Sequence, residues 1–269
     1  MAHAWKACKE VTLSRVRIPL SPPFLLILYK KQNNNYYMKY RNSLEQKRNF
    51  EFLFYKIYHF IFGEKFLKKI NYNFDTSKTR LDLIHYLIKK KNYKSYLEIG
   101  CHQDEVFSLV NIDKVGVDPM SGGNFRGTSD EFFLQNKKKF DCIFIDGLHI
   151  YEQVIKDIKN SINFLSENGT IILHDCLPSK VTHQYVPRSR YTWNGDVWKA
   201  IVEARTWKDV ETFTILADQG LGVITKKKNS DLLIMKNKNF KKIKFEYLYY
   251  NYEKIMRTIT YDNFINLID

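Results

Sequence analysis

From Tyr96 onward, short apolar runs alternate with stretches of helical periodicity, and this alternation limits the fold more than any other feature of the sequence. Strand-length apolar runs stand at 96–100, 115–119, 140–147 and 170–175. Strands that alternate with helices predict a doubly wound α/β fold, a mostly parallel sheet with helices on both faces. Two later runs, 213–217 and 220–225, predict that the sheet ends in an antiparallel pair.

Several residues indicate where the helices begin and end. Thr76-Ser77 is expected to cap one helix, and Asp104 a second that reaches Val110. Apolar residues at helical spacing predict a third helix, which Asn168-Gly169 is expected to end. These apolar residues are Tyr151, Ile155, Ile158, Ile162 and Leu165. A fourth helix is expected over 196–205.

Changes in composition divide the chain into four parts. Residues 1–37 are expected to be a non-native or disordered extension, because Ser14–Pro23 (SRVRIPLSPP) resembles a peptide read through the 3′ arm of a transfer-RNA gene. Met38 is then the expected initiator. A helical segment over 38–92 follows, which either covers the sheet edge or acts as a lid or docking surface. The α/β domain spans 93–228, and a helical extension that packs back on it spans 229–269.

The basic charge lies almost wholly upstream of the α/β domain. Residues 1–92 carry a net charge of +13, residues 93–228 a net charge of −1, and residues 229–269 a net charge of +2. A protein that acts on nucleic acid places basic residues around its working face, so the neutral domain argues against a nucleic-acid partner. The upstream lysines indicate either a solvated surface or weak attraction to an anionic membrane or polymer.

Cysteine usage and hydropathy favour a cytoplasmic protein. The four cysteines, Cys8, Cys101, Cys142 and Cys176, show no spacing typical of disulfides or metal sites, so reduced thiols are expected. The apolar run Pro23–Tyr29 is far shorter than the roughly 18 residues of a membrane span and lacks a signal-peptide cleavage site. The sequence predicts no oligomeric state.

The ends of the first two predicted strands indicate an adenosine cofactor. Gly100 ends the first strand, where the backbone must turn sharply and approach a ligand. Asp118 ends the second strand, where a carboxylate can accept both hydroxyls of a ribose. The loop lacks the G-x-G-x-x-G of a dinucleotide site and the chain lacks a P-loop. Together with Glu98, these features favour S-adenosylmethionine.

Five motifs carry a family resemblance across about 130 residues. They are YLEIG ending at Gly100, VDP ending at Pro119, GTSDEFF over 127–133, FIDGLH ending at His149, and LHD ending at Asp175. In this order they resemble the small-molecule and sugar O-methyltransferase-like group of class I S-adenosylmethionine-dependent enzymes, which have a Rossmann-like fold.

The resemblance assigns cofactor-binding residues. It implies that Glu98, Gly100 and Cys101 line the methionine end and that Asp118 holds the ribose. It further implies that Ser129 and Asp130 lie near the adenine and that Asp146 forms the floor of the cofactor site. The chain departs from the family pattern after Gly100, where His102, Gln103 and Asp104 replace the usual second glycine.

Ionisable residues follow two strands that should be neighbours in the sheet. Asp146 and His149 follow one strand, and His174 and Asp175 follow the next. In one mechanism, His149 is the general base that takes a proton from a substrate hydroxyl. In another, Asp146 and Asp175 hold Mg²⁺ or another divalent cation that lowers the pKa of that hydroxyl.

The residue after the second aspartate favours metal-independent chemistry. Metal-using relatives carry an acid or amide there, and this chain has Cys176. Purely structural roles for Asp146 and His174 stay open. Asp146 alternatively caps the helix that begins near Tyr151, and strand alternation is expected to point His174 away from the site when Asp175 faces it.

The segment 177–198 is predicted to be the loop that contacts the substrate, since it is long and rich in aromatic and basic side chains. These are His183, Tyr185, Arg188, Arg190, Tyr191, Trp193 and Trp198. Such side chains suit a glycan or a phosphorylated or carboxylated molecule. The alternative is a surface loop anchored by its aromatic residues.

The favoured function is therefore S-adenosylmethionine-dependent O-methylation of a sugar or another small polar metabolite. Three alternatives remain open at this point. The first is a non-catalytic relative that kept the fold, and the second is a nucleic-acid methyltransferase. The third is a hydroxylase-like relative, because Asp146, His149 and His174 also suit iron.

Overall fold

The structure is a computed structural model, and it describes residues 48–268. The predictions made for residues 1–37 and for Met38 lie outside the described residues. The chain divides into two compact units, Met1–Glu51 and Phe52–Asp269. Of the first unit only residues 48–51, the beginning of a helix described over 48–62, are described. The second unit contains the α/β domain.

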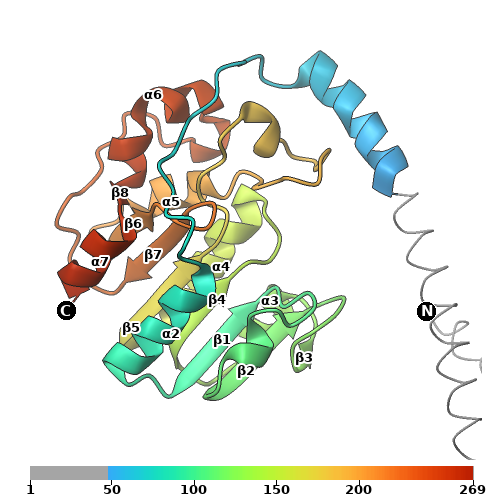
Figure 1. Cartoon of the computed structure of the whole chain (residues 1–269). Coiled ribbons are helices and arrows are strands. Elements are labelled where there is room, and N and C mark those ends of the chain that lie inside the picture. Colours follow the sequence, from blue (N-terminus) through green and yellow to red (C-terminus); the bar gives the residue numbers. More distant parts are fainter. Residues whose placement is uncertain (1–47, 269) are drawn as a thin grey trace, which may run out of the picture. The chain divides into compact units, whose positions relative to one another are not determined.

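One mixed sheet of eight strands forms the centre of the second unit, in the order β3-β2-β1-β4-β5-β7-β6-β8 (Figure 1). The strands are β1 (Ser95–Ile99), β2 (Asp113–Asp118), β3 (Phe125–Arg126), β4 (Phe140–Ile145), β5 (Leu165–Leu173), β6 (Glu211–Ile215), β7 (Leu221–Thr225) and β8 (Thr258–Ile259). Strand β7 pairs antiparallel with both β5 and β6, whereas every other pairing is parallel. The predicted sheet and its antiparallel pair are confirmed.

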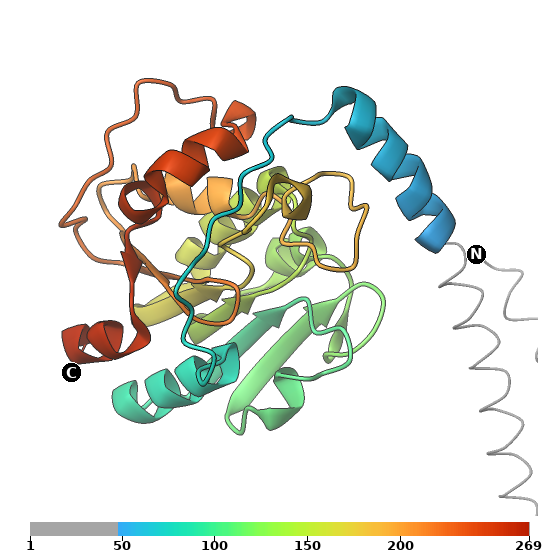
Figure 2. The same cartoon turned by 45° about the horizontal axis from the view of Figure 1, so that its top comes forward.

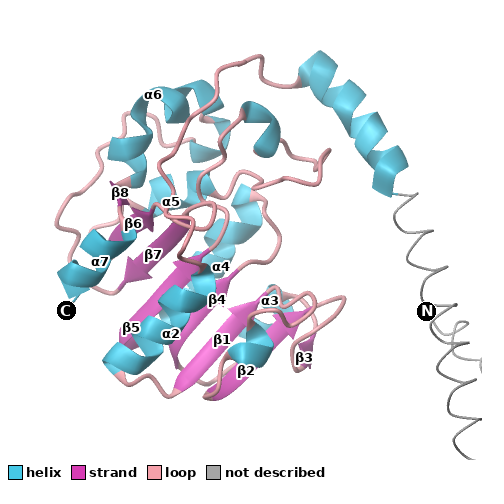
Figure 3. Ribbon diagram, viewed as in Figure 1, coloured by secondary structure: helices cyan, strands magenta, loops and turns pink. Residues whose placement is uncertain are grey.

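Helices cover both faces of this sheet (Figures 2 and 3). They are α2 (Arg80–Lys91), α3 (Ser129–Gln135), α4 (Tyr151–Phe164), α5 (Trp198–Ala204), α6 (Phe245–Met256) and α7 (Tyr261–Ile268), with 3₁₀ turns η1 (Phe107–Leu109), η2 (Val181–His183) and η3 (Phe240–Lys242). Apolar residues of α3, α4, α5 and α6 share one core cluster, and those of α2 and α7 share the other. No helix within 48–268 has the length and apolar character needed to cross a membrane.

The central strands are buried on both faces, which explains their nearly continuous apolar sequence. In β4, Ile143 and Ile145 join the core under α4, while Cys142 and Phe144 join the core under α2. Ile145 is in register with both Ile99 of β1 and Leu173 of β5. The residues that follow these three strands therefore meet at one edge of the sheet.

Two predicted helix boundaries are wrong. The second helix begins after Thr79, whose side chain and that of Asp82 form a reciprocal capping box, so Thr76-Ser77 is not its cap. Helix α4 ends at Phe164, and Asn168-Gly169 lie inside β5. The reason is that Leu165 already pairs with Phe140 of β4, so the chain passes from helix into strand without a glycine cap.

The C-terminal segment packs on the helices of one face of the sheet. Phe245, Leu248 and Met256 of α6 are buried in the same cluster as α4 and α5. Strand β8, which the sequence did not indicate, pairs in parallel with β6 over a short stretch and forms this edge of the sheet.

Candidate active site

Gly100 forms the turn that brings three strand ends together. Its φ is +89°, and a Cβ at this position would lie 2.3 Å from the carbonyl oxygen of Asp146. The Gly100 amide donates to Val117 O at 2.8 Å, and the Asp146 amide donates to Ile99 O at 2.8 Å. A side chain at position 100 would push the ends of β1 and β4 apart, so only glycine fits.

The loop after Gly100 is not the predicted helix. His102 and Asp104 both have a positive φ, +48° and +61°, and residues 107–109 form only the 3₁₀ turn η1. A helix N-cap needs an extended backbone, which Asp104 does not have. Its side chain instead accepts the Gly123 amide at 2.6 Å and so fastens this loop to the one after β2.

Asp118 lies at the end of β2, and its carboxylate accepts three backbone amides. They are those of His102 at 2.9 Å, Met120 at 2.7 Å and Ser121 at 2.9 Å. Burial acts to raise the pKa of Asp118, but these donors outweigh it and lower the pKa. The structure thus places an ionised carboxylate beside the Gly100 loop.

Glu98 and Cys101 both have buried side chains, on the side of the sheet covered by α2. The Tyr96 hydroxyl donates to Glu98 Oε2 at 2.6 Å. Burial raises the pKa of Glu98 to about 7 and raises the pKa of the Cys101 thiol. Cys101 belongs to the loop that Gly100 begins, and Glu98 stands near the end of β1, just before that loop.

Ser129 and Asp130 begin α3 and bind α4. Ser129 Oγ donates to Asp157 Oδ1 at 2.6 Å, and Asp130 forms an ion pair with Lys156 at 2.9 Å. Gln153 of α4 reaches both Ser129 and Asp130. The side chains of these two predicted adenine contacts are thus engaged by α4.

The four ionisable residues predicted at the ends of β4 and β5 do converge. Asp146 Oδ1 lies 3.1 Å from His149 Nε2 and 3.3 Å from His174 Nδ1. His149 Nδ1 lies 3.2 Å from Asp175 Oδ2. Asp146 does not cap α4, because Asp196 Oδ1 accepts the Tyr151 amide at 2.7 Å.

The expectation that His174 points away from the site is wrong. Strand β5 ends at Leu173, and Asp175 has a φ of +60°, so the alternation of side chains stops before these residues. Both His174 and Asp175 therefore reach the same cluster.

Arg80 and Asp218 complete the cluster, and the sequence analysis missed them. Arg80 Nη1 donates to Asp146 Oδ2 at 2.9 Å, and Arg80 Nε lies 3.1 Å from Asp218 Oδ2. Asp218 Oδ1 lies 3.3 Å from His174 Nε2. Both residues come from segments distant in sequence, and neither stands in a recognisable motif.

His174 is an imidazolium held between two carboxylates. Burial acts to lower its pKa, but the hydrogen bonds to Asp146 and Asp218 outweigh it and raise the pKa to about 10. Arg80 Nη1 also lies 3.0 Å from His174 Nδ1. Since arginine only donates, we assign the Nδ1 proton to the bond with Asp146. Burial acts to raise the pKa of Asp146, but the hydrogen bonds that its carboxylate accepts from His149 and His174 outweigh burial and lower this pKa.

His149 has the one buried side-chain nitrogen of this cluster that lacks a hydrogen bond among the described residues. Its Nε2 faces Asp146, but its buried Nδ1 has no hydrogen-bond partner among the described residues, although Asp175 Oδ2 is 3.2 Å away. Burial acts to lower the pKa of His149, yet Asp146 and Asp175 raise it overall. Burial raises the pKa of Asp175, whose Oδ1 accepts Asn194 Nδ2 at 2.8 Å. A proton on Nδ1 would form a hydrogen bond to Asp175, and a metal ion would instead be bound by both Nδ1 and the Asp175 carboxylate.

Asp146, His149 and Asp175 also form a candidate metal-ligand set. Each offers one ligand atom, and these atoms lie within 4.8 Å of one another. Two carboxylates and an imidazole suit a divalent cation, and the unpartnered Nδ1 fits this use. The residues present therefore fit a metal, although Asp146 already accepts hydrogen bonds from Arg80 and His174.

The segment 177–198 covers His149. The Trp193 ring stacks on the His149 ring at a centroid distance of 5.3 Å, and Arg188 lies over the same indole at 5.4 Å. A Cβ on Gly195 would lie 1.8 Å from His149 O, so this turn also packs closely on the site. Trp198 is fully buried and donates to Gln184, so it anchors the segment in the core.

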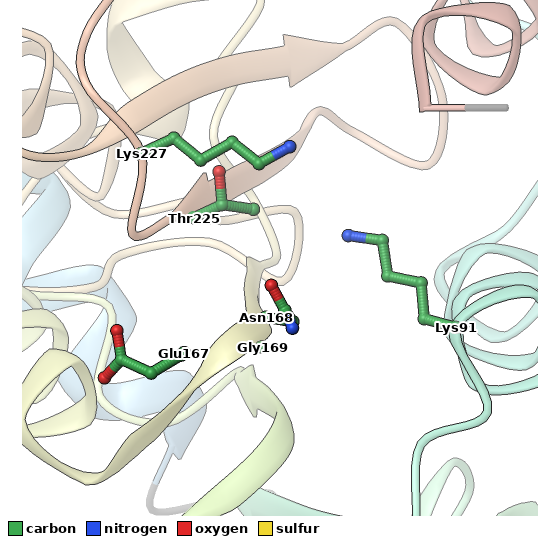
Figure 4. Close-up of a pocket in the computed structure, with 6 residues that line it drawn as sticks. All are labelled: Lys91, Glu167, Asn168, Gly169, Thr225 and Lys227. Atoms are coloured by element: carbon green, nitrogen blue, oxygen red, sulfur yellow. The ribbon is translucent and has the colours of Figure 1, made fainter.

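A cavity of about 250 Å³ lies away from this cluster (Figure 4). It is lined by Lys91, Glu167, Asn168, Gly169, Thr225 and Lys227. Glu167 to Gly169 belong to the first half of β5, whereas the cluster follows the other end of that strand. None of the predicted site residues lines it.

Residues 93–176 match the model of a family described as a methyltransferase domain. A comparison with curated proteins gave no significant match.

Three solved structures illustrate the similarity in fold. A putative caffeoyl-CoA O-methyltransferase from Staphylococcus aureus is 19% identical, with 70% of this chain and 98% of that chain aligned and a TM-score of 0.42. The SAH-bound Podospora anserina methyltransferase PaMTH1 is 16% identical, over 56% and 80% of the two chains, with a TM-score of 0.42. The MycE methyltransferase of the mycinamycin pathway, in complex with Mg, SAH and mycinamycin VI, is 14% identical, over 57% and 50%, with a TM-score of 0.37.

The sheet order and the family match define the class of the protein. The order 3-2-1-4-5-7-6 with an antiparallel β7 is the Rossmann-like fold of class I S-adenosylmethionine-dependent methyltransferases. The matched segment runs from just before β1 through the end of β5. Residues 93–176 therefore belong to a methyltransferase domain, and the sheet that contains them has the fold of the S-adenosylmethionine-dependent class.

The imidazolium state of His174 predicts a pH-dependent stability. The pKa of His174 is about 10 in the fold, against an ordinary value of 6.5. Its stabilising contribution is therefore complete below pH 6.5 and lost as the pH rises through about 10. We expect His174→Gln to lower the free energy of unfolding by roughly 3 kcal/mol at acidic to neutral pH, and by progressively less toward alkaline pH. Urea titrations of both proteins across this range measure the difference, and a pH-independent difference would contradict the assignment.

Proposed function

We propose that the protein transfers the methyl group of S-adenosylmethionine to a hydroxyl group of a sugar or another small polar metabolite. The observation that carries this proposal is the buried Nδ1 of His149, which faces Asp175 without a hydrogen bond. The transfer requires that a hydroxyl lose its proton, and Nδ1 is the atom of the cluster that can accept it.

The cofactor would bind at the ends of β1 and β2. Asp118 is the proposed ribose ligand, since its carboxylate is ionised and lies beside the Gly100 loop. Gly100 allows the cofactor to approach the backbone closely, and the buried Glu98 and Cys101 are proposed to line the methionine end of the cofactor. Ser129 and Asp130 are proposed to border the adenine through the start of α3, which α4 holds in place.

Asp146 and Asp175 give the two nitrogens of His149 different tasks. Asp146 accepts the Nε2 proton and so keeps the lone pair of the neutral ring on Nδ1. The acceptor oxygen attacks the methyl carbon, the bond from that carbon to the sulfonium sulfur breaks, and the hydroxyl proton passes to Nδ1. The products are the methyl ether, S-adenosylhomocysteine and an imidazolium that Asp175 stabilises across 3.2 Å.

The charges of the cluster agree with the uptake of one proton. Asp146, Asp175 and Asp218 supply three negative charges, and Arg80 and protonated His174 supply two positive ones. With His149 neutral, the cluster carries one net negative charge, and a proton on His149 brings it to zero. Because the groups are largely buried, this balance favours the imidazolium over an unpaired anion.

A metal-assisted variant of the same reaction is the second candidate. It is favoured by the Asp146, His149 and Asp175 ligand set. A divalent cation held there would lower the pKa of the acceptor hydroxyl. In that case His149 and Asp175 act as ligands, and Asp146 orients the imidazole or joins them.

Trp193, Arg188 and Tyr191 are proposed to contact the acceptor. Trp193 stacks on His149, and Arg188 lies over Trp193, so an aromatic and cationic surface borders the reactive nitrogen. Tyr191 is 58% exposed. Such a surface suits the ring faces and hydroxyl groups of a sugar.

A cytoplasmic site of action is also proposed, since the cysteines within 48–268 are buried free thiols.

Cofactor binding tests the first half of this proposal. We expect Asp118→Ala to raise the Kd for S-adenosylmethionine at least about tenfold, because the charged hydrogen bonds to the ribose are lost. Isothermal titration calorimetry measures this Kd. Asp113→Ala is the matched control, since Asp113 begins the same strand, is exposed and pairs with Lys138. Wild-type protein that fails to bind the cofactor, or equal Kd values for all three proteins, would contradict the proposal.

The pH profile tests the second half. The pKa of His149 is raised above 6.5, and only its neutral form accepts a proton, so kcat should rise with pH until it levels off above that pKa. We expect His149→Gln to abolish the rise and to lower kcat about 10²- to 10⁴-fold. The assay follows methyl transfer from labelled S-adenosylmethionine to the best acceptor in a panel of sugars and small hydroxylated metabolites.

The same assay separates the two candidates. Activity that persists after dialysis against EDTA supports His149 as the base. Activity that EDTA removes and Mg²⁺ restores supports the metal-assisted variant. A pH rise that survives in His149→Gln would contradict the assignment of the base.

A further inference from the structure

The helix over 48–62, drawn in blue in Figure 1, exposes an unusual amount of apolar surface. Nine of the eleven residues from Phe52 to Phe62 are aromatic or aliphatic. Six of them are 55% to 80% exposed, namely Leu53, Phe54, Ile57, Phe60, Ile61 and Phe62. A contiguous exposed patch of this kind marks an interaction surface.

One narrow side of the same helix already packs against segment 177–198. Phe52 and His59, two turns apart, are buried. Phe52 packs edge-on against the Tyr191 ring at 5.2 Å, and His59 stacks on the Tyr185 ring at 4.3 Å. His59 Nε2 also lies 2.7 Å from Pro187 O. These contacts fix the helix on segment 177–198, so the six exposed residues cannot turn inward without breaking them.

Basic residues accompany the exposed apolar ones. Lys56 lies within the helix, and Lys65, Lys68 and Lys69 follow it, all of them exposed. The acidic residues from 48 to 70 are Glu51 and Glu64, and the Glu64 carboxylate accepts the amides of Phe245 and Glu246. The surface therefore combines aromatic and aliphatic side chains with a local excess of positive charge.

We propose that this helix is a docking surface for an anionic lipid membrane, lying in the plane of the interface with its exposed apolar residues among the lipids. Interfacial helices bind by inserting Phe and Leu while Lys contacts anionic headgroups, and both kinds of residue are present here. A second copy of the chain fits less well. A symmetric contact would pair this surface with itself, so both faces would carry the same excess of positive charge, with Glu64 committed to its own chain.

Docking would act on the segment beside the reactive centre. The segment held by Phe52 and His59 also carries Trp193, which stacks on His149. A helix bound to lipid would hold this segment in place. The surface itself does not depend on which molecule is methylated, so vesicle binding is measured independently of methyl transfer.

Co-sedimentation of the full chain with lipid vesicles tests the proposal. We expect binding to phosphatidylcholine vesicles that contain about 30% phosphatidylserine, weaker binding to pure phosphatidylcholine, and partial release in about 1 M salt. The triple variant Phe54→Gln, Ile57→Gln, Ile61→Gln should bind at least about tenfold more weakly, since each buried apolar side chain contributes a factor of this order. The double variant Lys56→Gln, Lys69→Gln should bind the anionic vesicles more weakly than the wild type does, while its binding to pure phosphatidylcholine should be unchanged.

The matched control is Leu134→Gln combined with Ile234→Gln. Both residues are apolar and at least 87% exposed, but they lie outside the helix, so this variant should bind as the wild type does. All the substituted side chains are exposed, and circular dichroism checks that each variant is folded. Absence of wild-type binding, or equal binding by the triple variant and the wild type, would overturn the proposal. A dimer in light scattering that the triple variant dissociates, without vesicle binding, would assign the surface to a second copy instead.

Discussion

The carboxylate of Asp146 is the contact on which the geometry of the site depends. It accepts hydrogen bonds from His149, His174 and Arg80. These residues come from the loop after β4, the end of β5 and the start of α2. Because a buried carboxylate without partners is costly, the three donors and the three chain segments that carry them are held together. Asp218 extends this network by pairing with both Arg80 and His174.

The parallel sheet supplies the frame for that contact. The last residues of β1, β4 and β5 are in register, so the residues after them meet at one edge. Gly100 permits the close approach of β1 to Asp146, and Asp118 fastens the loop beside it. The proposed cofactor end and the proposed proton-accepting end of the site thus share one turn, so the same backbone contacts would position the methyl donor and the base.

The strands and the convergence of Asp146, His149 and Asp175 could be predicted from the sequence, because apolar periodicity reports strands and parallel strand ends share an edge. Arg80 and Asp218 could not, since single charged residues carry no signal of long-range pairing. The orientation of His174 depended on the left-handed backbone of Asp175, which no sequence pattern indicated. The helix expected to begin at Asp104 does not form, because Asp104 also has a left-handed backbone. In the sequence Asn168-Gly169 resembled the end of a helix, although the strand had already begun at Leu165.

We propose that Asp146 keeps the proton on Nε2 of His149 and leaves Nδ1 to accept one from the substrate. Nitrogen NMR of histidine-labelled protein, titrated from acidic to alkaline pH, measures the protonation of each ring nitrogen directly. We expect His149 to titrate above pH 6.5 from the imidazolium to the Nε2–H form, while His174 stays doubly protonated up to about pH 10. A neutral His149 with its proton on Nδ1, or a His174 that is neutral at pH 7, would contradict this proposal.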